Sequence, residues 1–268
     1  MRLQLLSDLH LETESFEPEP APGAELLVLA GDIDATWAAL DRFRGWPVPV
    51  VFVAGNHEFD GRELTRAWPA LRERCNALGL TLLERESMVV TAVGGCRVRF
   101  VGCTRWCDFD LFGAEQRECA LRAAGYFMRL MAATRDGQPF DAALVREEAL
   151  ASRRWLEGEL RRPRGDWDAT VVVTHFAPSR RSADPRYGDQ PTTASFCNAD
   201  DDLLPLAQLW IHGHVHCRHD YPGADAGGAA ARVVCNARGL ARKGEVEGFD
   251  GMRVFDVDAH LTGVNALT

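Results

Sequence analysis

The chain has 268 residues, and 30 lysines and arginines against 39 aspartates and glutamates give a formal net charge of −9. This acidic balance argues against a protein that coats duplex nucleic acid, because neutralising phosphates requires a basic surface. The 46% hydrophobic and 26% charged residues exclude disordered and fibrous classes, and apolar runs such as 50–54 are far shorter than the roughly 18 residues of a membrane span.

Short β-branched runs that end at Gly, Asp or Asn predict strands along the whole chain. They cover residues 3–6, 26–30, 48–54, 88–93, 98–102, 170–174, 209–212, 232–235 and 252–257. Gly94 and Gly95 predict a tight hairpin between two of them. Apolar residues at helical spacing predict helices over 61–78, 115–131 and 141–160. Alternating strands and helices indicate an α/β fold, and the strand-rich second half indicates a second sheet.

Two stretches lack periodicity and predict loops. Residues 177–200 are rich in Ser, Pro, Asp and Gly, and a loop of that length is usually functional or mobile. Residues 223–231, rich in Gly and Ala, predict a flexible surface loop. Neither resembles a linker between domains, so we expect residues 1–268 to form a single domain.

Polar residues that bind metals follow five of the predicted strands at their carboxyl ends. They are Asp8 and His10, Gly31 and Asp32, the run Gly55-Asn56-His57-Glu58, His175, and the run Gly213-His214-Val215-His216. Because such strand ends converge at one edge of an α/β sheet, we expect these side chains to lie together. Side chains two residues apart on an extended segment point the same way, which makes Asp8 and His10 natural paired donors.

Each fragment alone has an ordinary explanation. An Asp-x-His pair can simply be solvated, Asp32 can close a turn, and Asn56 can occupy a left-handed turn position. Together the residues supply two carboxylates, one amide and four imidazoles, too many donors for one tetrahedral ion. Shared through a bridging carboxylate, the set suits two divalent metals about 3.5–4 Å apart.

With these five blocks in this order, the sequence resembles the calcineurin-like metallophosphoesterases. The resemblance spans residues 8–216 and implies a four-layer α-β-β-α sandwich of two mixed sheets flanked by helices. It also implies that Asp8, His10 and His216 hold one metal, that Asp32 bridges, and that Asn56, His175 and His214 complete the second site. His57 would be a histidine that meets the substrate without binding metal.

The implied chemistry is hydrolysis of a small or nucleotide-like phosphodiester or phosphomonoester. Two cations lower the pKa of water from about 15.7 to about 7, so that a metal-bridging hydroxide can attack phosphorus. His57 would act as the general acid toward the leaving group. Carboxylate and imidazole donors suit Mn²⁺, Fe or Zn²⁺, and we expect manganese.

One departure from the family selects among its branches. The protein phosphatases continue after the bridging Asp with an acidic-Arg-Gly tripeptide, whereas this chain reads Asp32-Ile-Asp-Ala-Thr36. The spacings resemble the cyclic-nucleotide phosphodiesterase and nuclease-type branches more closely. The acidic partner that orients the histidine in phosphatases corresponds to Ala35 here, which leaves Asp34 as a guess for that role.

Other residues have both a functional and a structural interpretation. Arg105 could bind substrate phosphate and Trp106 could stack on a base, although the residues favour a core Trp beside an exposed Arg. Arg180 and Arg181 lie in the loop after His175 and could add phosphate affinity or form a solvated pair. We expect His212 to support the site or the core and not to be a further ligand.

The eight cysteines contain no C-x-x-C pair, and Asp8 and His10 interrupt the amino-terminal apolar run before a secretory signal could form. We therefore expect reduced thiols and a cytoplasmic location. The partner would be a small phosphoester, with no membrane. Two other functions stay open: a single-strand nuclease, disfavoured by the acidic charge and the missing capping domain, and a non-catalytic scaffold that has lost its metals.

Overall fold

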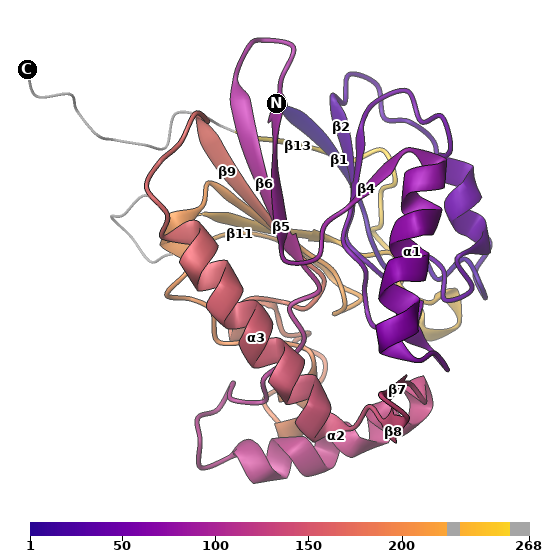
Figure 1. The fold of residues 1–268 in the computed structure, drawn as a ribbon, viewed down its shortest axis with the longest axis vertical. Coiled ribbons are helices and arrows are strands. Elements are labelled where there is room, and N and C mark those ends of the chain that lie inside the picture. The colour runs from indigo at the N-terminus through magenta and orange to yellow at the C-terminus, as the bar shows by residue number, and fades with distance from the viewer. Residues whose placement is uncertain (224–230, 258–268) are drawn as a thin grey trace, which may run out of the picture.

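The computed structural model describes residues 1–223 and 231–257 and contains two large sheets that face each other (Figure 1). The five-stranded sheet has the order β13-β1-β2-β3-β4. Its strands are β1 (Arg2–Leu6), β2 (Leu26–Leu29), β3 (Val50–Phe52), β4 (Leu80–Leu82) and β13 (Val254–Asp256). β1 to β4 pair in parallel and β13 is antiparallel to β1, so the carboxyl ends of four strands share one edge.

The six-stranded sheet has the order β11-β12-β10-β9-β6-β5. Its strands are β5 (Glu86–Thr91), β6 (Arg97–Cys103), β9 (Ala169–Thr174), β10 (Leu209–His212), β11 (Arg218–Pro222) and β12 (Arg232–Asn236). The four central strands are parallel, and the two edge strands are antiparallel to their neighbours. Both sheets are therefore mixed, as the family resemblance implies.

The central strands are apolar on both faces because each face is covered. In β2, Leu26 and Val28 pack between the two sheets, while Leu27 and Leu29 belong to the cluster that includes the apolar face of a helix. In β9, Val172 faces the opposite layer from its neighbours on either side. Such strands read as unbroken hydrophobic runs, which is why they are visible in the sequence.

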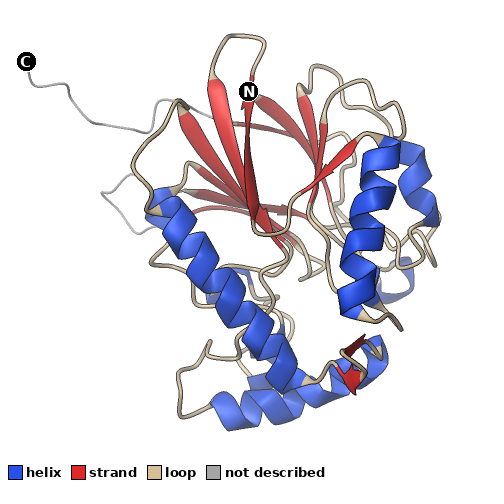
Figure 2. Cartoon of the chain, in the orientation of Figure 1, coloured by secondary structure: helices blue, strands red, loops and turns tan. Residues whose placement is uncertain are grey.

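The described residues contain three α-helices: the first and third flank the sheets, and the second lies below the sandwich, across the lower end of the third, in the view of Figures 1 and 2. They are α1 (Leu64–Leu78), α2 (Arg117–Met131) and α3 (Ala142–Leu160). α1 covers the outer face of the five-stranded sheet, and α3 packs Leu156 and Leu160 against the outer face of the six-stranded one. The Asp141 side chain caps α3 by accepting from the amides of Ala143 and Leu144, both at 3.0 Å. This arrangement confirms the predicted sandwich.

The strand between α1 and β5 and the strand after His216 are absent from the sequence prediction. β4 has only three residues, and β11 carries charged side chains on an edge, so neither shows an apolar run. A small hairpin, β7 (Thr134–Arg135) with β8 (Gln138–Pro139), also escapes prediction. The hairpin expected at Gly94 and Gly95 is present between β5 and β6.

The long loop over 177–200 contains short 3₁₀ turns, and one of these packs against α2. Over residues 1–223 and 231–257, the 3₁₀ turns are η1 (Ala38–Phe43), η2 (His57–Phe59), η3 (Arg180–Ser182), η4 (Pro191–Ser195), η5 (Leu204–Leu206) and η6 (Ala241–Lys243). Most of the loop predicted over 223–231 lies outside the described residues.

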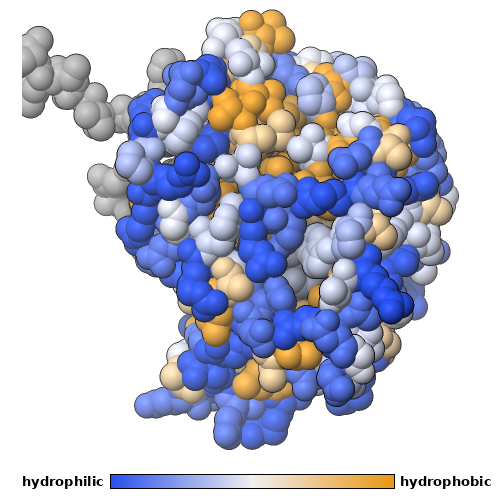
Figure 3. Space-filling view, in the orientation of Figure 1, coloured by the Kyte–Doolittle hydropathy of each residue, from blue (hydrophilic) through white to orange (hydrophobic). Residues whose placement is uncertain are grey.

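Hydrophilic residues cover most of the face shown in Figure 3, with apolar residues in separate patches. Within residues 1–223 and 231–257, no helix combines the length and the apolar character that crossing a membrane requires.

Candidate metal centre

The parallel strands deliver the predicted ligands to one edge of the sandwich. Asp8 and His10 follow β1, Asp32 follows β2, Asn56 and His57 follow β3, His175 follows β9, and His214 and His216 follow β10. Because the parallel strands of each sheet run in one direction, their carboxyl ends meet there. The structure brings all eight of these residues to this edge.

The backbone at this edge is unusually strained. Five of the candidate ligands have left-handed backbones: Asp8 (φ 54°), His10 (48°), Asp32 (54°), His214 (69°) and His216 (51°). Such conformations cost roughly 1–2 kcal/mol each and persist where the surrounding fold holds them, commonly at functional sites. Gly31 has φ 89°, and a Cβ there would lie 2.2 Å from Nδ1 of His175, so only glycine fits between these turns.

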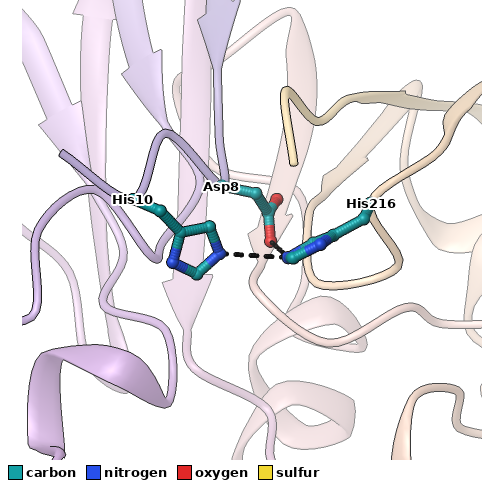
Figure 4. A group of neighbouring side chains, drawn as sticks. All are labelled: Asp8, His10 and His216. Carbon is teal, nitrogen blue, oxygen red and sulfur yellow. Dashed lines mark hydrogen bonds and ion pairs between the residues drawn. The ribbon is translucent and has the colours of Figure 1, made fainter. Parts of the chain in front are cut away.

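Asp8, His10 and His216 form a compact group, which we call half-site one (Figure 4). Their candidate ligand atoms lie within 4.8 Å of one another, and Nε2 of His10 is 3.0 Å from Nε2 of His216. Oδ1 of Asp8 lies 3.5 Å from the same His216 nitrogen. The outer nitrogens contact carboxylates: His10 Nδ1 is 3.1 Å from Glu12, and His216 Nδ1 is 2.6 Å from Glu245.

Asn56, His175 and His214 form a second group, half-site two. Nε2 of His175 lies 3.3 Å from Oδ1 of Asn56, and His175 and His214 cluster with Asp32 within 4.8 Å. Main-chain carbonyls orient the two rings: Nδ1 of His175 donates to Ala30 at 2.8 Å, and Nε2 of His214 donates to Ser195 at 3.1 Å.

Asp32 lies between the half-sites. Its carboxylate is within 4.8 Å of His10 in one group and of His175 and His214 in the other. Burial opposes its charge, but His175 and His57 hold the pKa of Asp32 well below its usual range. Burial lowers the pKa of His175, but the charge of Asp32 outweighs this effect and raises that pKa to about 9.

Two observations show that these residues fit divalent cations. Oδ2 of Asp32 is buried and receives no hydrogen bond within the described residues, and Nε2 of His175, whose Nδ1 donates to Ala30, lies 3.2 Å from it; buried carboxylate oxygens are normally satisfied. If each outer nitrogen of His10 and His216 donates to its carboxylate, two bare lone pairs face each other at 3.0 Å. A cation between them removes that repulsion, and oxygen with imidazole donors suits Mn²⁺, Fe or Zn²⁺.

His57 lies beside this centre with its side chain 39% exposed. Its ring packs edge-on against His10, with the ring centroids 5.0 Å apart, and its amide donates to Asp32 at 2.9 Å. Nδ1 is 2.7 Å from Oδ2 of Asp60. Burial lowers the pKa of His57, but Asp32 and Asp60 outweigh burial and raise it to about 10.

The orienting partner of His57 is therefore Asp60 and not Asp34. The Asp34 carboxylate instead accepts from the amide and hydroxyl of Thr36 and from the amide of Ala39. It closes the turn that leads into η1. Asp60 is three residues after His57, the spacing at which one 3₁₀ turn brings side chains together.

Three further glutamates support the centre, and sequence reasoning assigned none of them a role. Glu58 is fully buried and accepts from the amides of Asp32, Ile33 and Gly55, which fixes two ligand turns together. Burial and the charge of Asp32 raise the pKa of Glu58 to about 7. The sequence feature that could have identified Glu58 is its place beside His57 in a run of polar residues after a strand. Glu12 and Glu245 sit in loops with no periodic relation to the ligands.

Arg105 requires a correction, because the structure gives it a structural position. Its side chain is 0% exposed, with Nε and Nη2 2.9 and 2.8 Å from the Asp200 carboxylate. Nη2 also contacts Asp108 at 3.0 Å, and Nη1 donates to two main-chain carbonyls. Every guanidinium nitrogen is thus engaged, and none is available to a substrate. Trp106 is likewise buried in the core.

The other candidates surround the centre without joining it. His212 is buried between Ser182 Oγ at 2.9 Å and the carbonyl of Gly213 at 3.0 Å, and burial lowers its pKa to about 3. It is therefore a neutral core histidine. Arg180 pairs with Asp189, while Arg181 lies over the ring of Tyr221. All eight cysteines are free thiols.

The chain was compared with known families, sequences and structures. A family model described as calcineurin-like phosphoesterase matches residues 1–218. The structure of a phosphopantetheinyl hydrolase from Mycobacterium tuberculosis is similar, with a TM-score of 0.71, 20% identity and 96% of each chain covered. GAP50, the anchor in the inner membrane complex of Plasmodium, gives a TM-score of 0.39 at 14% identity, over 88% of this chain and 70% of that one.

The comparison with curated protein sequences finds no match. The likeness to the hydrolase is a likeness of fold, since only one residue in five is identical. The family model, in contrast, covers four fifths of the chain and includes every strand end that carries a candidate ligand. The chain therefore belongs to the calcineurin-like phosphoesterase family.

Proposed function

We propose that this protein is a binuclear metal-dependent phosphoesterase. The observation that carries the proposal is the buried Asp32 carboxylate, which lies within reach of both half-sites and whose Oδ2 receives no hydrogen bond, with Nε2 of the candidate ligand His175 3.2 Å away. The residues that would hold the two ions are Asp8, His10 and His216 on one side and Asn56, His175 and His214 on the other, with Asp32 shared.

The ions would supply Lewis acidity, lowering the pKa of a water molecule and neutralising charge on the phosphoryl oxygens. The chain supplies the geometry. The left-handed turns at Asp8 and Asp32 aim both carboxylates inward, and Glu58 ties the amides of neighbouring turns together so that the donors cannot drift apart. Donors without thiolates favour manganese, with iron or zinc as alternatives.

His57 would give a proton to the departing oxygen of the ester. Its ring is the partly exposed imidazole at the edge of the centre, and Asp60 holds Nδ1, which leaves Nε2 toward the side where substrate would bind. Its raised pKa keeps the ring protonated at neutral pH, as a general acid requires. This role depends on position and charge together.

The substrate we propose is a small or nucleotide-like phosphodiester or phosphomonoester. Family membership supports the ester chemistry, and the net charge of −9 disfavours duplex nucleic acid. Since all eight cysteines are free thiols, we place the protein in the cytoplasm, working as one unit over residues 1–268.

The test combines metal content with turnover. Protein purified without chelator is analysed for bound metal and assayed with Mn²⁺ on bis-p-nitrophenyl phosphate and p-nitrophenyl phosphate. We expect close to two ions per chain and turnover that chelator abolishes, and the ratio of the two rates distinguishes a diesterase from a monoesterase.

Turnover of a short single-stranded oligonucleotide in the same assay would support the nuclease alternative. The alternative of a non-catalytic scaffold would be supported if the protein holds less than one tightly bound ion and turns over neither ester, even with added Mn²⁺.

A further inference from the structure

The chain continues past the end of the family match at residue 218 and returns to half-site one. We call residues 237–245 the clasp segment. It follows β12 and lies along the turn that carries the first ligands: Ala237 bridges to Ser7, the amide of Arg238 donates to the Ser7 carbonyl, and the amide of Gly239 donates to the Asp8 carbonyl, both at 3.0 Å.

An ion pair and several hydrogen bonds hold the clasp segment at a second place. The Arg238 side chain is 10% exposed and lies 2.9 Å from Oε2 of Glu14, which also accepts from the amide of Ala241 at 3.1 Å. Arg218 donates to the main-chain carbonyls of Glu245 and Glu247. Side chains on both sides of half-site one therefore fix the path of this segment.

The segment ends by placing one carboxylate against a candidate ligand. Glu245 is 5% exposed, and its Oε2 lies 2.6 Å from Nδ1 of His216 and accepts from the amide of Leu240 at 2.9 Å. Gly239 makes this approach possible. Its φ is 70°, and a Cβ there would lie 2.7 Å from Cβ of Glu245 and 3.1 Å from Cβ of His216.

We propose that Glu245 is a positioning residue of the metal centre, and that the clasp segment is an integral part of half-site one. This rests on the proposed function. Glu245 holds the proton of His216 on Nδ1, which directs the Nε2 lone pair toward Asp8 and His10 and makes the imidazole a stronger donor. Carboxylates behind metal-binding histidines have this effect, and their loss typically costs 10–100-fold in metal affinity.

The first experiment measures the affinity of each ion in Glu245→Gln. Glutamine keeps the shape and can still accept from Leu240, but it lacks the charge. The matched control is Glu247→Gln, which removes one exposed carboxylate two residues away. With Mn²⁺ and a competing chelator, we expect Glu245→Gln to weaken one of the two ions by about 10–100-fold and to leave the other unchanged.

The second measurement observes the ring itself. Nitrogen-15 NMR of the histidines should show His216 protonated on Nδ1 in the wild type, with that proton shifted upfield in Glu245→Gln and unchanged in Glu247→Gln. Glu245→Asp, which restores the charge on a shorter side chain, should recover part of the lost affinity.

Wild-type affinity for both ions in Glu245→Gln would overturn the proposal, as would a His216 ring whose proton does not respond. The failure of the proposed function looks different: the wild type itself would bind no ion. In that case the NMR measurement on metal-free protein still decides whether Glu245 sets the protonation of His216. Equally weakened metal binding in Glu245→Gln and Glu247→Gln would show that the loss comes only from the reduced net charge, and this result would also overturn the proposal.

Discussion

The two half-sites have similar candidate ligands, but they support their histidines in opposite ways. In half-site one, the outer nitrogens of both imidazoles contact carboxylates: Glu12 is 3.1 Å from His10, and Glu245 is 2.6 Å from His216. In half-site two, both imidazoles donate to neutral main-chain carbonyls, at 2.8 and 3.1 Å. One pair of histidines is therefore supported by charge and the other by backbone dipoles.

The two half-sites therefore differ in the negative charge that surrounds them. Asp8, Glu12 and Glu245 all lie at half-site one, whereas half-site two has a charged ligand only through the shared Asp32. Burial raises the pKa of Glu245, but the hydrogen bonds that it accepts from His216 and from the amide of Leu240 outweigh burial and lower the pKa to about 2, so this carboxylate stays ionised. Because cation affinity rises with nearby negative charge, we expect half-site one to hold its ion more tightly.

The largest effect is expected where the half-sites meet. Asp32→Asn keeps the shape but removes the shared charge, so both ions should be lost and turnover should fall more than about 100-fold, beyond the typical effect of a supporting residue. Metal content and kcat/KM measure this. The matched control is Asp34→Asn, because Asp34 is an equally buried carboxylate two residues away that bonds only Thr36 and Ala39. A fully metallated Asp32→Asn would refute the shared role.

The asymmetry itself is tested by removing one histidine from each side. His175→Ala should leave one ion per chain after dialysis, because half-site one is intact. His10→Ala should leave less than one, because the site that remains is the weaker. Both variants should lose more than about 100-fold in turnover. Equal residual metal in the two proteins would show that the carboxylates behind half-site one do not affect affinity.

The sequence predicts the candidate ligands and their meeting place because these residues follow apolar strands directly. Once the strands at 3–6, 26–30 and 209–212 are recognised, the polar residues after them must meet at one edge. The supporting residues carry no such signal. Glu245 lies 29 residues after His216, and only the return path of the clasp segment brings the two together. Asp60 escapes prediction because its contact depends on a single 3₁₀ turn.

His57 extends the comparison to a histidine outside both half-sites that is also supported by a carboxylate. Asp60 helps to raise its pKa to about 10, so Asp60→Asn should lower that pKa. Activity that requires protonated His57 is then lost at lower pH, and the alkaline limb of the pH–rate profile should move toward neutral by about 1 unit. Metal content should not change. If the alkaline limb does not move, Asp60 has no role in proton transfer.

The smallest effect on the centre is expected from Arg105, whose buried charge serves the fold alone. Asp200 is completely buried, so Arg105→Met leaves it with Arg153 at 2.6 Å as its remaining cationic partner. Removing one member of a buried pair costs about 3 kcal/mol in the free energy of unfolding. Urea denaturation should show this loss, with metal content and KM unchanged. Arg153 contacts the same carboxylate from a partly exposed side chain, so Arg153→Met should cost less stability. A raised KM in Arg105→Met with unaltered stability would show that Arg105 binds substrate, even though all its guanidinium nitrogens are hydrogen-bonded within the protein.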